Sequence, residues 1–359
     1  MTIDNRIKAF VSLGNFLNQF SGEKIRQDNN SLNNLFYNDF EELIKVVHIH
    51  NPWFTEDNVR NAVGAISRSL NPELVIDWIS PYLSDLTRAK ESKHVAVIMA
   101  GNIPLVGFHD MLCVLISGNK FIGKLSSDDK LLLPFLAKIV IAIEPEFIDH
   151  IVFTTDQLKK FDAVIATGSN NSARYFEYYF GKYPTIIRKN RNSIAVLTGA
   201  ETTDELSLLG NDVFQYFGLG CRNVSKLFVP KGYKFDTFYE SVFSFKEIVY
   251  NNKYANNYEY NRTVYLMSNN PTLLDNNFLL LKEDAGYSSP IGVLFYEYYN
   301  SLESLNHRLE NEFEQIQCIV SNSVAIKNAI PFGHAQCPQL NDYADGIDTM
   351  KFLIGLDIL

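Results

Sequence analysis

The sequence contains only four cysteines, and their spacing excludes several kinds of site. Cys113, Cys221, Cys318 and Cys337 form no CxxC pair and match no set of zinc ligands. We therefore predict no metal site. Residues 1–6 also lack the basic stretch and following apolar stretch of a secretory leader. We expect a cytoplasmic protein whose thiols are reduced.

Long apolar runs and an excess of positive charge are also missing. The longest apolar run, residues 131–143, is too short to span a bilayer and contains Pro134 and Lys138, so no membrane span is predicted. The 32 basic and 41 acidic residues give a net charge of −9. Broad nucleic-acid binding needs a dense basic face, so nucleic acid is not an expected partner. Because the chain is acidic, an anionic ligand would need positively charged residues at its own binding site.

What the sequence does contain is enough apolar material for a large core. Of the 359 residues, 46% are hydrophobic and 13% aromatic, and the 20% that are charged have both signs interspersed. This composition excludes a disordered chain, and the length indicates two domains. Residues 1–90 are predicted to be mostly helical, with helices over 57–70 and 72–83, because their apolar residues recur at helical spacing.

From His94 onwards, short apolar strands alternate with helices. Strands are predicted at 95–99, 120–124, 151–153 and 163–166, with helices over 105–116 and 129–143 between them. This alternation is typical of βαβ units and a parallel sheet. Ligands of such sheets bind outside the carboxyl ends of the strands. Asn102, Lys124 and the pair Gly168-Ser169 each lie just after a predicted strand.

Cys221 lies in a second predicted α/β region, after a domain boundary expected near residues 185–193. A strand is predicted at 194–197, a helix over 204–217 and a further strand at 224–229. Between these last two elements, Cys221 follows Gly220 on a tight turn, where a nucleophile can be held exposed beside backbone N–H groups. A cysteine beside a glycine is also commonly structural, so this motif alone leaves both interpretations open. For the other cysteines we predict a core position for Cys113, a strand for Cys318 and a loop for Cys337.

Five segments occur together, of which the first four resemble a known superfamily and the last resembles one branch of it. They are Ala100-Gly101-Asn102-Ile103-Pro104, Gly123-Lys124-Leu125-Ser126, Thr167-Gly168-Ser169, Gly218-Leu219-Gly220-Cys221, and a tail that runs from Pro331-Phe332-Gly333-His334 to Asp345-Gly346-Ile347-Asp348-Thr349-Met350. These segments resemble the aldehyde dehydrogenase superfamily, and more closely its acyl-CoA reductase branch of the LuxC type. The resemblance extends from about residue 95 to the end of the chain.

The resemblance implies an α/β, aldehyde dehydrogenase-like fold with two Rossmann-like parallel-sheet domains and an N-terminal helical layer. Residues 1–190 would hold the N-terminal helices and bind the nicotinamide cofactor, and residues 191–330 would form the catalytic cysteine domain. Residues 331–359 would return to the cofactor domain or to the cleft between domains. Association into a homo-oligomer is left open.

The resemblance also implies the chemistry. Cys221 would be the nucleophile and Asn102 would stabilise the oxyanion, with Arg222 or the bound cofactor favouring the thiolate. Lys124 and Ser126 would bind the adenosine ribose, and Gly168 and Ser169 the phosphates. The expected reaction is the NADPH-dependent reduction of an acyl thioester, acyl-CoA or acyl carrier protein, to the aldehyde.

The sequence departs from the oxidising members of the superfamily at one point. Where they have a Glu-Leu-Gly-Gly segment, residues 188–192 are Arg-Lys-Asn-Arg-Asn and contain no carboxylate. Without that general base, water attack on an acyl-enzyme should be slow, which favours removal of the acyl group by hydride. An acyl phosphate reductase and a non-catalytic subunit that retains the fold are the alternatives.

Most of these residues also have a purely structural interpretation. Asn102 could cap a helix near Pro104, Lys124 could be an ordinary exposed lysine, and Ser169 could be no more than an N-cap.

The remaining polar candidates are equally open. Arg222 is either a cation that activates the thiolate or a surface residue. His334 and His109 are either proton donors or structural histidines. The basic run at residues 188–191 either contacts a phosphate of the cofactor or of CoA, or forms a solvated strand edge.

Overall fold

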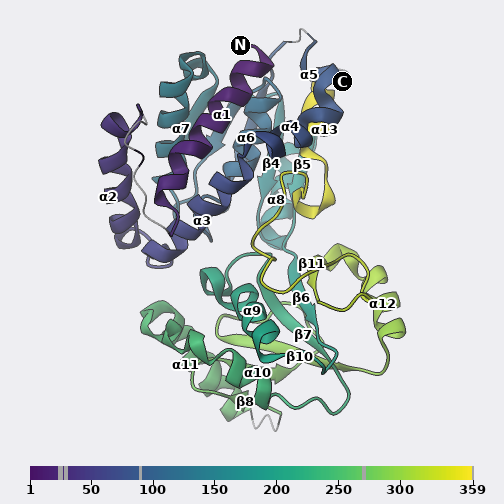
Figure 1. The fold of residues 1–359 in the computed structure, drawn as a ribbon. Coiled ribbons are helices and arrows are strands. Elements are labelled where there is room, and N and C mark those ends of the chain that lie inside the picture. Colours follow the sequence, from purple (N-terminus) through teal and green to yellow (C-terminus); the bar gives the residue numbers. More distant parts are fainter. Residues whose placement is uncertain (23–26, 28–30, 89–90, 269–271, 358–359) are drawn as a thin grey trace. The chain divides into compact units, whose positions relative to one another are not determined.

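The computed structural model describes residues 1–22, 27, 31–88, 91–268 and 272–357. The chain forms two compact units (Figure 1). Unit 1 comprises Met1–Lys189 together with Gln339–Leu359, and unit 2 comprises Asn190–Pro338. Within the described ranges, no helix combines the length and apolar composition needed to cross a membrane.

Unit 1 is built on a five-stranded parallel sheet in the order β3-β2-β1-β4-β5. The strands are β1 (His94–Ile98), β2 (Lys120–Lys124), β3 (Ile151–Thr154), β4 (Ala163–Thr167) and β5 (Thr185–Arg188). The strand order reverses between β1 and β4, so ligands are expected outside the carboxyl ends of these two strands. The strands predicted from the sequence are confirmed.

Helices cover most of this sheet. They are α1 (Ile3–Leu17), α2 (Asn38–Val46), α3 (Glu56–Ser69), α4 (Pro72–Ile79), α5 (Leu83–Leu86), α6 (Phe108–Ile116), α7 (Leu132–Ile143), α8 (Asn170–Phe180) and α13 (Thr349–Ile354). The predicted N-terminal helices are confirmed, and α3 begins where Thr55 accepts a hydrogen bond from the Asn58 amide. One face of the sheet packs into a large apolar core with α1, α6 and α7 (Figure 1). On the other face, α8 packs on β4 and β5.

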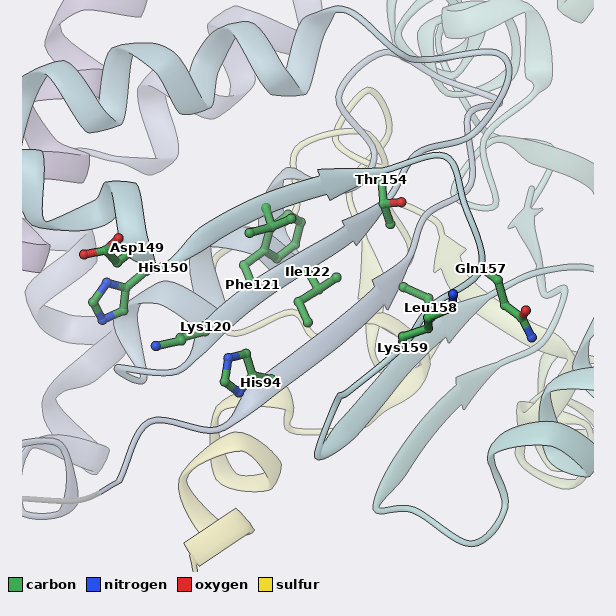
Figure 2. A pocket seen from close by; sticks show the side chains of 11 residues that line it. His94, Lys120, Phe121, Ile122, Asp149, His150, Thr154, Gln157, Leu158 and Lys159 are labelled. Carbon is green, nitrogen blue, oxygen red and sulfur yellow. The ribbon is translucent and has the colours of Figure 1, made fainter.

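Part of that second face has no helix over it. The connection from β3 to β4 contains no helix, although the faces of parallel sheets are usually covered. Figure 2 shows the resulting hollow of about 250 Å³, in which His94, Lys120 and His150 lie toward one end and Gln157 and Lys159 toward the other. None of the site residues predicted from the sequence lines it.

Unit 2 contains a seven-stranded sheet in the order β12-β11-β6-β7-β10-β9-β8. Its strands are β6 (Asn192–Val196), β7 (Val224–Pro230), β8 (Leu274–Asp275), β9 (Leu280–Glu283), β10 (Val293–Tyr299), β11 (Ile316–Val320) and β12 (Ala329–Ile330). Neighbouring strands are parallel except β8 and β9. The helices are α9 (Thr203–Phe214), α10 (Asp236–Ser241), α11 (Asn252–Met267) and α12 (Leu302–Asn311). Separate apolar clusters cover its two faces.

Candidate active site

Cys221 lies in unit 2, on the turn that joins α9 to β7, and it is exposed. The turn is closed by the Asn223 amide, which donates to the Gly220 carbonyl at 3.0 Å. The Ser193 hydroxyl, at the start of β6, donates to the Cys221 carbonyl at 2.9 Å. The segment is therefore closed by its own backbone and joined to β6 through Ser193.

The helix that leads to Cys221 is shorter than predicted. It was expected to extend over 204–217, but α9 ends at Phe214. Tyr216 and Phe217 have φ of 53° and 59°, and Gly218 has a φ of 75°. This left-handed conformation costs an ordinary residue about 1–2 kcal/mol. The backbone just before Cys221 is thus strained, and tertiary contacts must hold it.

Asn223 provides several of those contacts. Its side chain is buried, and Oδ1 accepts from the Gly220 amide at 2.8 Å. Its Nδ2 donates to the carbonyls of Asp212 at 3.1 Å and Gln215 at 2.8 Å, two acceptors that the end of α9 leaves unpaired. Asn223 was not singled out from the sequence. The only available signal was a polar residue directly before an apolar strand.

Replacing Asn223 by alanine is expected to destabilise unit 2 by about 2 kcal/mol, because buried backbone groups of α9 and of the turn lose their partners. Urea unfolding followed by far-UV circular dichroism measures this loss. Asn256→Ala, on the exposed side of α11, is the matched control. Equal stabilities of the two variants would contradict the role given to Asn223.

A loop near the end of unit 2 lies against this turn. Asp212, buried on α9, accepts hydrogen bonds from the backbone amides of Gly333 at 2.6 Å and Ala335 at 2.9 Å. Burial raises the pKa of this carboxyl group to about 6, against the opposing effect of those two amides. The Arg222 Nε donates to the Ala335 carbonyl. His334, which is exposed, belongs to the same loop.

In unit 1, Asn102 lies on an exposed turn after β1. Helix α6 begins at Phe108 with Gly107 as its N-cap, rather than at residue 105 as predicted, so Asn102 does not cap it. Leu105, where the helix was predicted to begin, has a φ of 60°, which does not fit a right-handed helix. Its amide donates to Asp129 Oδ2 at 3.2 Å.

The turn after β2 lies against the Asn102 turn. A Cβ atom placed on Gly101 would approach Ser126 Oγ to 2.4 Å, so only glycine allows this contact. Lys124, at the end of β2, donates from Nζ to the backbone carbonyls of Thr155 and Asp156, the latter at 2.8 Å. Lys124 is thus directed toward the carboxyl end of β3 by hydrogen bonds and is not an unconstrained surface lysine.

Gly168 and Ser169 follow β4. Ser169 is the N-cap of α8 and accepts from the Ser172 amide at 3.2 Å, so the helix start is confirmed. A Cβ on Gly168 would lie 2.8 Å from Ser172 Cβ, so the first turn of α8 packs closely on this residue. Capping does not exclude phosphate binding, since both use the first amides of the helix.

Arg188 has neither of the roles considered for it. It is buried, and it donates from Nη1 to Asp110 Oδ2 at 2.7 Å and from Nη2 to Thr349 Oγ1 at 3.0 Å. It is therefore the cation of an internal ion pair, neither a phosphate ligand nor part of a solvated edge. Lys189, the next residue, forms an exposed ion pair with Glu177 at 3.0 Å.

His109 also lies in the interior of unit 1. Burial lowers the pKa of its imidazole, and its Nε2 lies 2.9 Å from the Leu340 carbonyl. The rings of Trp78 and Tyr343 pack against it. These contacts indicate a structural histidine. In the part of the chain that the structure describes, no group of His, Cys, Asp and Glu side chains could hold a metal ion.

Comparison with known proteins identifies a family model that matches the chain and solved structures with a similar fold. A family model described as acyl-CoA reductase (LuxC) matches residues 44–238, more than half of the chain. No curated protein sequence matches. Among solved structures, aldehyde dehydrogenase 21 from Physcomitrella patens, in complex with succinate, has a TM-score of 0.65 at 14% identity, over 99% of this chain and 85% of that one.

Two bacterial structures are similar in the same way. The NAD-dependent aldehyde dehydrogenase from Sinorhizobium meliloti has a TM-score of 0.63 at 12% identity, over 92% of this chain and 74% of that one. An aldehyde dehydrogenase from Bacillus cereus, in complex with NAD⁺, has a TM-score of 0.59 at 13% identity, over 90% and 73%. The predicted α/β, aldehyde dehydrogenase-like fold is confirmed.

Proposed function

Because the chain belongs to the acyl-CoA reductase (LuxC) family, we propose that it reduces an acyl thioester to an aldehyde through an acyl-enzyme on Cys221, with NADPH as reductant. The observation that supports this most is the placement of Cys221. It is exposed, yet its turn is fixed by Asn223 and follows a strained stretch of backbone. Strain of this kind is concentrated at functional sites.

In the first step, the Cys221 thiolate attacks the thioester carbonyl. The carbon–sulfur bond to the carrier then breaks, and the carrier thiolate leaves and takes up a proton. The negative charge that develops on the carbonyl oxygen needs hydrogen-bond donors, which we assign to the Asn102 side chain and a backbone N–H of the Cys221 turn. Arg222 lies beside Cys221 in sequence and contributes positive charge that favours the thiolate.

The residues after β2 and β4 fit a nicotinamide dinucleotide. Lys124 and Ser126 present N–H and O–H donors suited to ribose hydroxyls, and the first amides of α8, with Ser169, suit a phosphate. When bound, the reduced nicotinamide supplies the hydride that converts the acyl-enzyme to aldehyde and regenerates the Cys221 thiolate. The residues of the chain bind the acyl thioester and the cofactor and align them.

The fate of the acyl group depends on residues 188–192, which contain no carboxylate to activate water. Arg188 is committed to its ion pair with Asp110. The acyl-enzyme therefore has no general base from this segment, and transfer to hydride is favoured over hydrolysis.

The proposal is tested by incubating the protein with a panel of acyl-CoAs, without cofactor, and analysing the Cys221 peptide by mass spectrometry. We expect an added acyl mass on that peptide, and free CoA plus aldehyde once NADPH is supplied. NADH and acyl phosphates are offered in parallel. Aldehyde formation from acyl-CoA without any adduct on Cys221 would overturn the mechanism. Faster reduction of acyl phosphate would reassign the substrate, and neither adduct nor turnover would indicate a non-catalytic subunit.

A further inference from the structure

Strained backbone is concentrated at the two turns that hold Asn102 and Cys221. In the described ranges, the non-glycine residues with positive φ are Leu105, Lys160, Tyr216, Phe217, Asn277, Asn328 and Asp345. Asn and Asp tolerate this conformation, but the other residue types do not. Of those others, only Lys160 lies away from the two turns. Such outliers persist where surrounding contacts force them.

In unit 1 the contact comes from Asp129, just before α7. Its side chain is only 8% exposed, and its Oδ2 accepts from the amide of the strained Leu105 at 3.2 Å. Its Oδ1 accepts from the Leu132 amide at 3.4 Å. One carboxylate therefore joins the Asn102 turn to the start of α7, which begins at Leu132 rather than at the predicted residue 129.

In unit 2 the corresponding residue is Asp212, which is 1% exposed. Its carboxylate holds the amides of Gly333 and Ala335, and the Ala335 carbonyl in turn accepts from Arg222, the neighbour of Cys221. The backbone carbonyl of Asp212 accepts from the Asn223 side chain, whose Oδ1 in turn accepts from the amide of Gly220, the residue before Cys221. The residues on both sides of the nucleophile are thus connected to Asp212.

Both carboxylates are held mainly by backbone amides, and neither makes an ion pair within the described residues. Burying a carboxylate without a cation is costly, so a role confined to packing would be met better by an apolar residue. At each of these sites the two backbone amides bond to different carboxylate oxygens. An asparagine in the same position would present one oxygen and one NH2 group, so one of the two hydrogen bonds would be lost in this geometry.

We propose that Asp129 and Asp212 are positioning residues, of which Asp129 holds the Asn102 turn and Asp212 holds the Cys221 turn. Their assignment as positioning residues for catalysis rests on the function proposed above. The hydrogen bonds themselves are observed in the structure and do not depend on that function. Burial raises the pKa of Asp129 to about 6, as it does for Asp212.

Protonation removes an acceptor at each site, so the proposal also predicts that turnover falls as the pH drops below about 6. The charged groups facing Asp212 are Arg222 and His334. Among the residues that the structure describes, Asp129 faces the backbone amides of Leu105, Leu131 and Leu132. The variants below show whether Asp129 or Asp212 is responsible for the acid limb of the profile.

The test compares Asp129→Asn and Asp212→Asn by kcat and by the rate at which iodoacetamide alkylates Cys221, which does not depend on the proposed reaction. Each variant is expected to lower kcat about 10- to 100-fold, since a displacement of about 1 Å is enough for such a loss. Asp212→Asn should also slow alkylation and flatten the acid limb of the pH profile. Asp129→Asn should leave alkylation unchanged.

Asp204→Asn and Asp77→Asn, both on exposed helix surfaces, are the controls. Folded Asp129→Asn and Asp212→Asn variants with kcat, alkylation rate and pH profile like these controls would overturn the proposal. If the protein lacks turnover altogether, the proposed function fails, but the effect of Asp212→Asn on alkylation still tests whether this residue holds the turn.

Discussion

Cys221→Ala is expected to lower the turnover of an acyl thioester at least about 10⁴-fold, because the proposed acyl-enzyme forms on the Cys221 thiol. The variant should also show no acyl adduct by mass spectrometry. The fold should persist, since the Cys221 carbonyl, rather than its thiol, accepts the hydrogen bond from Ser193. Thermal unfolding close to that of the parent protein would show that the loss is chemical.

Cys337→Ala is the matched control for this experiment. Cys337 is the other exposed cysteine of unit 2, and its amide donates to the His334 carbonyl in the neighbouring loop. We expect this variant to retain turnover and the adduct on Cys221. If Cys337→Ala abolished the reaction while Cys221→Ala preserved it, the nucleophile would have to be reassigned.

The second large effect concerns stability. Asp110→Ala is expected to destabilise unit 1 by about 3–5 kcal/mol, because it leaves the buried Arg188 guanidinium without its carboxylate. Both tryptophans, Trp53 and Trp78, belong to unit 1. Their fluorescence during urea unfolding therefore follows the affected unit without a contribution from unit 2.

The exposed ion pair next to this one is its natural control. Lys189→Ala removes the partner of Glu177, and the expected change is within about 1 kcal/mol because both side chains are solvated. The double variant Asp110→Leu with Arg188→Met should recover much of the lost stability, since it removes the buried charge altogether. An Asp110→Ala variant as stable as Lys189→Ala would mean that the buried pair contributes little.

Much of unit 1 could be predicted because its signals are local. Short apolar runs such as residues 95–99 define strands, and glycines such as Gly101 and Gly168 follow them where the chain turns. The topology then brings these turns to one edge of the sheet. The fold class follows from the alternation of strands and helices.

What could not be predicted depends on contacts between distant parts of the sequence. Tyr216 and Phe217 leave the helix where the Asn223 side chain bonds to the carbonyls of Asp212 and Gln215, a contact that the local sequence does not reveal. Arg188 belonged to a basic run that looked solvated, but its partners are Asp110 and Thr349, far away along the chain. Buried polar residues with partners of this kind leave no periodic pattern.

The division of the chain has a consequence for how the protein is made. Unit 2 is one continuous stretch, whereas unit 1 also needs residues 339–357, which are translated after all of unit 2. These residues supply α13, the Thr349 hydroxyl that accepts from Arg188, and the Leu353 carbonyl that accepts from Asn119. On the ribosome, unit 2 can complete its core first. Unit 1 is synthesised earlier, but it lacks the contacts of its C-terminal residues until they have been translated. The order of folding would then be the reverse of the order of synthesis, and the incomplete unit 1 is the stage at which chaperones would be needed most.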